Sequence, residues 1–95
     1  VEFDLDICRS ILEGYAQQSR GSVRASDTAY LYPAIRLMPL ELGIRFLTDY
    51  LEGNRYFKVE SPDENLHKAM IQFRLTESIE RQGRWLRRII EELMR

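Results

Sequence analysis

Apolar residues recur at every third or fourth position through most of the chain, which is the spacing of one face of an α-helix. A first helix is predicted to begin near Asp4 or Asp6, since either side chain can cap free amide groups at the positive end of the helix dipole. Its narrow apolar face consists of Cys8, Ile11, Leu12 and Tyr15. The polar, glycine-containing stretch 17–22 then predicts a loop.

A second helix is predicted from about residue 26 or 27 to residue 52, with Gly53 as its stop. Because a proline inside a helix removes an amide donor and crowds the preceding turn, Pro33 and Pro39 predict a kink or a break into two pieces. Past Pro39 the helix is apolar around most of its circumference, and its thin polar stripe consists of Glu41, Arg45, Thr48, Asp49 and Glu52. We therefore expect this helix to be the central and most buried one.

A third helix is predicted to begin at Ser61-Pro62-Asp63-Glu64, which has the form of a capping box with proline at the first helical position, or at the later cap Asn65. Its apolar side shifts partway along, so the helix is expected to contact two partners or to bend near Gly83. No stretch alternates at period two for long enough to predict a strand. The pattern thus predicts an all-α fold of three main helical segments, forming one small helical subdomain over residues 1–95.

Charge and hydropathy exclude two classes of partner. The chain has 14 basic and 15 acidic side chains and a net charge of −1, which is too little to attract nucleic acid or an anionic membrane. The arginines after residue 80 are interleaved with glutamates four residues away, which is typical of a solvated helix face. No apolar run approaches the ~18 residues that a membrane span requires.

The chain begins at Val1 without an initiating methionine, which indicates a piece of a longer protein. The lone Cys8 cannot form an intramolecular disulfide, which fits a reducing compartment, and the predicted location is the cytoplasm. Since the second and third helices each have two apolar faces, three helices cannot hide all of that surface. We therefore expect the fragment to self-associate, with a dimer as one outcome.

No complete catalytic site can be assembled from these residues. Asp4 and Asp6 could hold Mg²⁺, but helix capping explains them better because no other ligand cluster accompanies the pair. His67 is the only histidine and is expected to be exposed, and Cys8 on its apolar face is expected to be buried and inert. The five glycines are scattered, so there is no glycine-rich phosphate loop, and no metal ligands are predicted.

The polar stripe of the second helix is the one constellation with functional promise. Arg45 has an acid four residues before it, Glu41, and another four residues after it, Asp49. One interpretation is a structural network of ion pairs within the helix. The other is the polar wall of a pocket, in which the guanidinium presents fixed donors to a ligand.

The run from Leu40 to Gly53, followed by Tyr56-Phe57-Lys58, resembles a segment of the N-acetylhexosamine 1-kinases, which belong to the aminoglycoside-phosphotransferase-like kinases. Some relatives carry the label mucin-desulfating sulfatase, but nothing in this chain supports sulfatase chemistry. The resemblance implies the C-terminal, substrate-side helical part of a kinase that uses ATP and Mg²⁺ to phosphorylate an N-acetylated hexosamine at its anomeric hydroxyl. The catalytic and metal-binding aspartates would then precede Val1.

The resemblance also implies the site residues. Arg45 and Tyr56 would line the sugar site, with Glu41 and Asp49 in support, and the chain alone would hold no cofactor and catalyse nothing. Its partners would be the N-terminal remainder of the kinase and the sugar. The alternative hypothesis is a free-standing helical module that uses its apolar faces to bind another protein.

Overall fold

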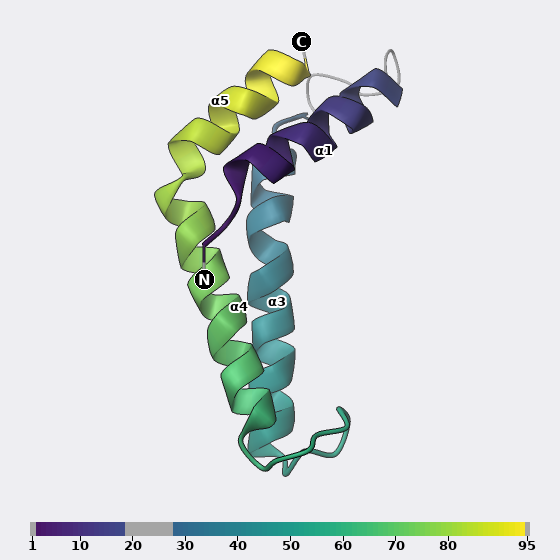
Figure 1. The fold of residues 1–95 in the computed structure, drawn as a ribbon, viewed down its shortest axis with the longest axis vertical. Helices are drawn as coiled ribbons and strands as arrows, with labels where there is room; N and C mark the ends of the chain where they lie inside the picture. The colour runs from purple at the N-terminus through teal and green to yellow at the C-terminus, as the bar shows by residue number, and fades with distance from the viewer. Residues whose placement is uncertain (1, 19–27, 95) are drawn as a thin grey trace.

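The computed structural model describes residues 2–18 and 28–94, and in these residues the fold is all-α, as predicted. The helices are α1 (Leu5–Gln18), α3 (Leu31–Leu51), α4 (Glu64–Arg81) and α5 (Gly83–Leu93). The predicted start of the second helix and residues 19–22 of the predicted loop lie outside the described residues. The loop prediction is wrong for Gln17 and Gln18, which are the last residues of α1. Together the helices form an elongated molecule with extents of 47 × 24 × 19 Å (Figure 1).

The helices α3 and α4 run side by side in opposite directions and form a long hairpin (Figure 1). They approach closely at Gly43, where an added Cβ would lie only 2.6 Å from Cε1 of Phe73. Glycine therefore lets the Phe73 ring lie against the backbone of α3. The expected break at Pro33 or Pro39 does not occur, because α3 runs unbroken through Pro39 and Pro33 lies in its first turn, where an amide needs no partner.

The bend expected near Gly83 is confirmed, since α4 ends at Arg81 and α5 starts at Gly83 in a new direction, toward α1 (Figure 1). The main core lies where α1, α5 and the ends of α3 and α4 meet. Its buried members are Leu12, Ile79, Leu86, Ile89 and Ile90. The molecule thus has a packed head at this end and a hairpin of two helices extending from it.

The segment before α1 is fastened to the junction of α4 and α5. The backbone N–H of Phe3 donates to Ser78 Oγ at 2.8 Å, and Gln82 Nε2 donates to the carbonyl of Phe3 at 2.8 Å. The Ser78 hydroxyl donates to Glu2 Oε2 at 2.8 Å, and Arg81 pairs with Glu2 Oε1 at 3.0 Å. We call these four contacts the N-terminal clamp.

Two helix starts test the capping predictions. Asp4 caps the first helix, since its Oδ1 accepts a hydrogen bond from the N–H of Ile7 at 3.0 Å. The capping box predicted at residues 61–64 is wrong: α4 begins at Glu64, with Asp63 as its cap residue and no side-chain cap bond. The Glu64 carboxylate instead accepts a hydrogen bond from the N–H of Glu60 at 3.0 Å, in the segment just before the helix.

The prediction that the second helix is the most buried is also wrong. Only Pro39, Gly43 and Asp49 of α3 are buried, and large apolar side chains of α3 stay exposed to solvent. The reason lies in the architecture, because along most of its length α3 has α4 as its one neighbour among the described helices (Figure 1). The sequence indicates correctly that α3 is apolar on several sides, but this part of the chain covers just one of them.

Candidate functional site

The site lies where α3 ends and the chain reverses toward α4. Gly53 stops the helix as predicted, with φ of +88°, and Asn54 follows with φ of +61°. Two successive residues in the left-handed region turn the backbone sharply, and such conformations favour glycine and asparagine. The side-chain amide of Asn54 donates to the carbonyl of Pro62 at 3.1 Å and holds the two ends of the connection together.

Asp49 organises this connection from the last turns of α3. Its side chain is buried, with 4% of the residue exposed. Its Oδ1 accepts the N–H of Tyr56 at 2.7 Å, and its Oδ2 accepts the N–H of Phe57 at 3.0 Å and Asn65 Nδ2 at 2.8 Å. Burial alone would raise the pKa of the carboxyl group, but these donors outweigh it and lower the pKa below its ordinary value.

Asn65 extends the same network to the first turn of α4. This residue is completely buried, and its Nδ2 also donates to Asn54 Oδ1 at 3.1 Å. One side chain of α4 thus contacts both the end of α3 and the turn that follows it. The connection is therefore fastened at both helices, which fixes where Tyr56 and Phe57 lie.

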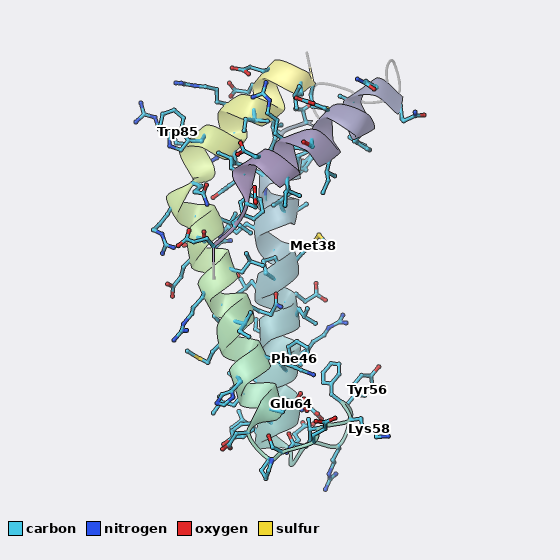
Figure 2. All side chains as sticks on the ribbon, viewed as in Figure 1. Met38, Phe46, Tyr56, Lys58, Glu64 and Trp85 are labelled. Atoms are coloured by element: carbon cyan, nitrogen blue, oxygen red, sulfur yellow. The ribbon has the colours of Figure 1, made fainter. Side chains whose placement is uncertain are left out.

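An open groove of about 510 Å³ lies between this connection and the last turns of α3. The residues that line it are Ile44, Arg45, Thr48, Asp49, Glu52, Tyr56 and Phe57. Its aromatic wall consists of rings in contact: the ring centroids of Phe57 and Phe46 lie 4.7 Å apart, and Tyr56 meets Phe57 edge-on at 5.0 Å. Figure 2 shows Tyr56 beyond Phe46, on the outer side of the hairpin.

Arg45 and Tyr56, the two residues expected to contact a substrate, both line this groove. The side chain of Arg45 is 66% exposed, and Tyr56 is 85% exposed. Arg45 Nη2 donates to Glu41 Oε1 at 2.7 Å, as the spacing predicts. Since a guanidinium has five N–H donors, this bond leaves donors that can face a ligand in the groove.

The expectation that Asp49 also supports Arg45 needs correction. Both carboxylate oxygens of Asp49 are occupied by the donors of the connection and of Asn65. No ion pair between Asp49 and Arg45 is found among the described residues. Asp49 therefore supports the other wall of the groove, by holding Tyr56 and Phe57, and within residues 2–18 and 28–94 Arg45 pairs with Glu41.

The remaining candidates have structural explanations. His67 is exposed, as expected. Cys8 is half-buried, less than expected, and this burial raises the pKa of its thiol. Residues 2–18 and 28–94 contain no group of three or more potential metal ligands. In this same part of the chain, no helix is long and apolar enough to cross a bilayer.

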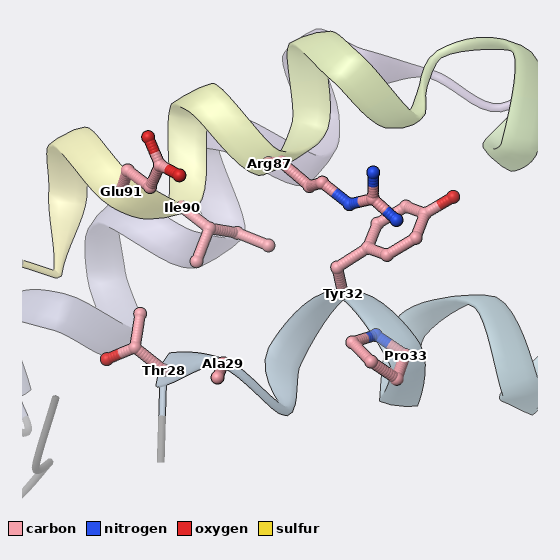
Figure 3. Close-up of a pocket in the computed structure, with 7 residues that line it drawn as sticks. All are labelled: Thr28, Ala29, Tyr32, Pro33, Arg87, Ile90 and Glu91. Atoms are coloured by element: carbon pink, nitrogen blue, oxygen red, sulfur yellow. The ribbon is translucent and has the colours of Figure 1, made fainter. Parts of the chain in front are cut away.

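A second hollow, of about 400 Å³, was not predicted from the sequence. It lies between α5 and the start of α3, and Figure 3 shows the Arg87 guanidinium over the Tyr32 ring, 4.3 Å from its centroid. Pro33, Ile90 and Glu91 also line it. No sequence signal could have found this hollow, because its two walls are far apart in the chain and meet only through the bend before α5.

No known protein-family model matches the chain. The geometry of the groove must therefore be interpreted from its own residues.

Proposed function

We propose that this chain is the C-terminal, substrate-side helical subdomain of an ATP-dependent kinase that phosphorylates an N-acetylated hexosamine at its anomeric hydroxyl. The observation that carries the proposal is the position of Arg45 and Tyr56. They belong to the two sequence pieces that resemble N-acetylhexosamine 1-kinases, and both line one groove. That groove is built by the same residues that give the resemblance, including Asp49 and Gly53.

The groove suits a sugar by its chemistry. The rings of Tyr56 and Phe57 offer flat apolar surface to the C–H face of a hexose, and the free N–H groups of Arg45 can donate to an acetamido carbonyl or a hydroxyl. Thr48 and Glu52 add a hydroxyl and a carboxylate for the sugar hydroxyls. These residues bind and orient the sugar, and none of them performs the phosphoryl transfer.

The phosphoryl transfer itself belongs to the N-terminal remainder of the kinase. It requires bound ATP with Mg²⁺, a phosphate cradle and a base that positions the attacking hydroxyl. In this proposal the remainder supplies all three and the present chain supplies one wall of the sugar site. The dependence on ATP agrees with the cytoplasmic location expected from the sequence.

The test is steady-state kinetics of the intact kinase with Arg45→Ala and Tyr56→Phe. We expect each variant to lose ~1–3 kcal/mol in kcat/KM for the sugar, because a buried hydroxyl or carbonyl of the substrate is left unpaired. The KM for ATP should stay unchanged. Arg74→Ala on the exposed side of α4 is the matched control and should retain wild-type kinetics.

Thermal melting must accompany the kinetics, because Arg45 also pairs with Glu41. If Arg45→Ala and Tyr56→Phe both keep wild-type sugar kinetics, the groove is not the sugar site and the proposal is wrong. A loss of stability in Arg45→Ala with unchanged kinetics would assign the ion pair a structural role only.

One observation favours a second function, the free-standing interaction module. The outer side of α3 exposes large apolar side chains, among them Leu37, Met38 and Leu51. Titration of the intact protein with an N-acetylated hexosamine, followed by NMR, separates the two functions. Shifts at Tyr56 and Phe57 support the sugar site, whereas unchanged spectra leave the apolar surface as the functional feature.

A further inference from the structure

Asn65 differs from the other polar residues near the groove, because it lines no part of the groove and is completely buried. It lies in the first turn of α4, one residue after the helix begins at Glu64. The sequence predicts it only as an alternative helix cap, but the cap residue of α4 is Asp63. The reason for an asparagine at this position therefore lies in what its side chain contacts.

The nitrogen of the Asn65 amide serves two acceptors. Its Nδ2 donates to Asp49 Oδ2 at 2.8 Å and to Asn54 Oδ1 at 3.1 Å. Because both partners are oxygens without a proton, the opposite orientation of the amide would bring oxygen against oxygen. The Asn65 Oδ1 atom is buried and has no hydrogen-bond partner among residues 2–18 and 28–94.

The amide nitrogen explains the presence of Asn65, and the amide oxygen does not. A buried acceptor without a donor lowers the stability of a fold. Leucine, which is similar in size, has no donor, and aspartate would place a second carboxylate against Asp49. Asparagine is thus the side chain of this size and shape that gives two N–H donors to these two oxygens.

Both acceptors determine where the connection lies. The Asp49 carboxylate also accepts the backbone N–H groups of Tyr56 and Phe57, at 2.7 and 3.0 Å. Asn54 is the second residue of the sharp turn after α3, with φ of +61°. One buried side chain of α4 is therefore bonded to the turn and to the carboxylate that holds the aromatic wall of the groove.

We infer that Asn65 is a positioning residue of the ligand site in the groove. It acts from α4 through Asp49 and Asn54, and it thereby places the aromatic wall for the ligand. Without the Asn65 amide, the Asp49 carboxylate loses a donor and Asn54 loses its bond to α4, so the connection can shift. The affinity for the ligand then falls, although every residue that lines the groove is still present.

The test is calorimetric titration of the intact protein with an N-acetylated hexosamine, which is the ligand of the proposed function on which this inference rests. The variant is Asn65→Asp, which keeps the size of the side chain and suits the first turn of a helix, where an acid is favourable. At about pH 8 it removes both donors and places two carboxylates together, so we expect the dissociation constant to rise at least about tenfold. Two carboxyl groups this close cannot both stay ionised, and toward about pH 5 one takes up a proton and can donate an O–H. The ratio of the variant's dissociation constant to that of the wild type should therefore decrease as the pH falls.

Thr76→Val is the matched control for a loss of stability in α4. Thr76 is also a buried polar residue of this helix, and its hydroxyl donates to the carbonyl of Gln72 at 2.9 Å, away from the groove. We expect a lower melting temperature and an unchanged dissociation constant for the sugar at every pH. If Asn65→Asp does not fold, Asn65→Ser is the second variant, and it should weaken sugar binding more than Thr76→Val does.

Arg45→Ala, titrated in parallel, separates this inference from the proposed function. If Arg45→Ala weakens sugar binding while a folded Asn65→Asp binds like the wild type, the inference about Asn65 is wrong and the proposed function stands. A loss of affinity in Asn65→Asp that is equal at every pH, or that Thr76→Val reproduces, also overturns the inference. If neither Arg45→Ala nor Tyr56→Phe weakens binding, the groove is not the sugar site, and the proposed function is wrong together with this inference.

Discussion

Asp49 is the side chain on which the shape of the groove depends most. Its carboxylate holds two consecutive backbone amides of the connection, and it does so from a buried position next to Asn65. Hydrogen bonds to an ionised acceptor are shorter and stronger than those between neutral groups. The positions of Tyr56 and Phe57 therefore depend on a residue that does not itself project from the surface.

Replacing Asp49 by Asn should release the connection. An amide has one acceptor oxygen in place of two, so a backbone N–H of Tyr56 or Phe57 would face an NH₂ group. We expect the melting temperature to fall by several degrees and the amide resonances of both residues to broaden or shift in NMR spectra. Glu52→Gln, which also removes a carboxylate at the end of α3 but an exposed one, should change neither measurement.

The lowered pKa of Asp49 has a consequence for pH dependence. A carboxyl group with a folded-state pKa below its ordinary 3.8 stabilises the fold above that value, and the stabilisation is lost as the pH falls through the folded-state pKa. We expect the free energy of unfolding, measured with urea, to fall between about pH 5 and pH 2. Asp49→Asn should show a shallower decline, and an unaltered slope would contradict this assignment.

A second carboxyl group contributes in the same pH range. The hydrogen bond from the Ser78 hydroxyl, helped by Arg81, lowers the pKa of Glu2, whose carboxylate belongs to the N-terminal clamp. The Asp49→Asn variant should therefore keep part of the decline. The double variant with Asp49→Asn and Glu2→Gln should show a still smaller fall in the free energy of unfolding between about pH 5 and pH 2.

At the residue scale, helical spacing predicts which side chains share a helix face more reliably than it predicts which groups they bind. The four-residue spacing correctly pairs Arg45 with Glu41, because both remain on one exposed helix face. The same spacing fails for Asp49, because its carboxylate accepts the backbone amides of Tyr56 and Phe57 and forms no ion pair with Arg45 among the described residues. Those amides reach Asp49 only because Gly53 and Asn54 reverse the chain, a geometry that no helix periodicity contains.

At the scale of elements, the approach of α3 and α4 at Gly43 is the contact most sensitive to a small change. Gly43→Ala would place a methyl group against the Phe73 ring. Overpacking of this kind costs ~1–3 kcal/mol, and the better helix propensity of alanine returns up to about 1 kcal/mol. With a return of about 1 kcal/mol, the free energy of unfolding measured with urea should fall by up to about 2 kcal/mol.

Gly14 provides the control for this substitution. It lies inside α1, and nothing lies within 4 Å of an added Cβ. Gly14→Ala should therefore stabilise the chain by up to about 1 kcal/mol through helix propensity alone. Equal effects of the two substitutions would show that the contact between Gly43 and Phe73 adds nothing.

The existence of the helices could be predicted from periodicity, but their burial could not. Apolar residues around α3 indicate how many neighbours the helix can accept, and the described chain provides one along most of its length. Of the two outcomes predicted at Pro39, a kink or a break, the structure excludes the break, because α3 runs through Pro39. Packing against a neighbouring helix can offset the amide donor that a proline removes. Pro39 is itself buried within α3.

At the scale of the whole molecule, the packed head and the extended hairpin differ in how they are held together. The hairpin is made by helices adjacent in the chain, and its connection is fastened by Asp49 and Asn65. The head depends on α1, which lies near the start of the sequence and packs against α5 near its end. The bend before α5 permits this contact, and the sequence signalled it through the change of apolar side near Gly83.

The N-terminal clamp has a consequence for the order in which parts of the chain open. Its hydrogen bonds join residues 75 to 79 positions apart, so closing them costs more loop entropy than closing the hairpin, by about 1–2 kcal/mol. A segment with few buried apolar contacts opens at low free energy, and Leu12 is the one buried residue of α1. Amide hydrogen exchange should therefore show two cooperative units, with α1 exchanging faster than the α3–α4 hairpin. Ser78→Ala should accelerate exchange in α1 and leave the hairpin protected, and a uniform acceleration would mean that the chain opens as a single unit.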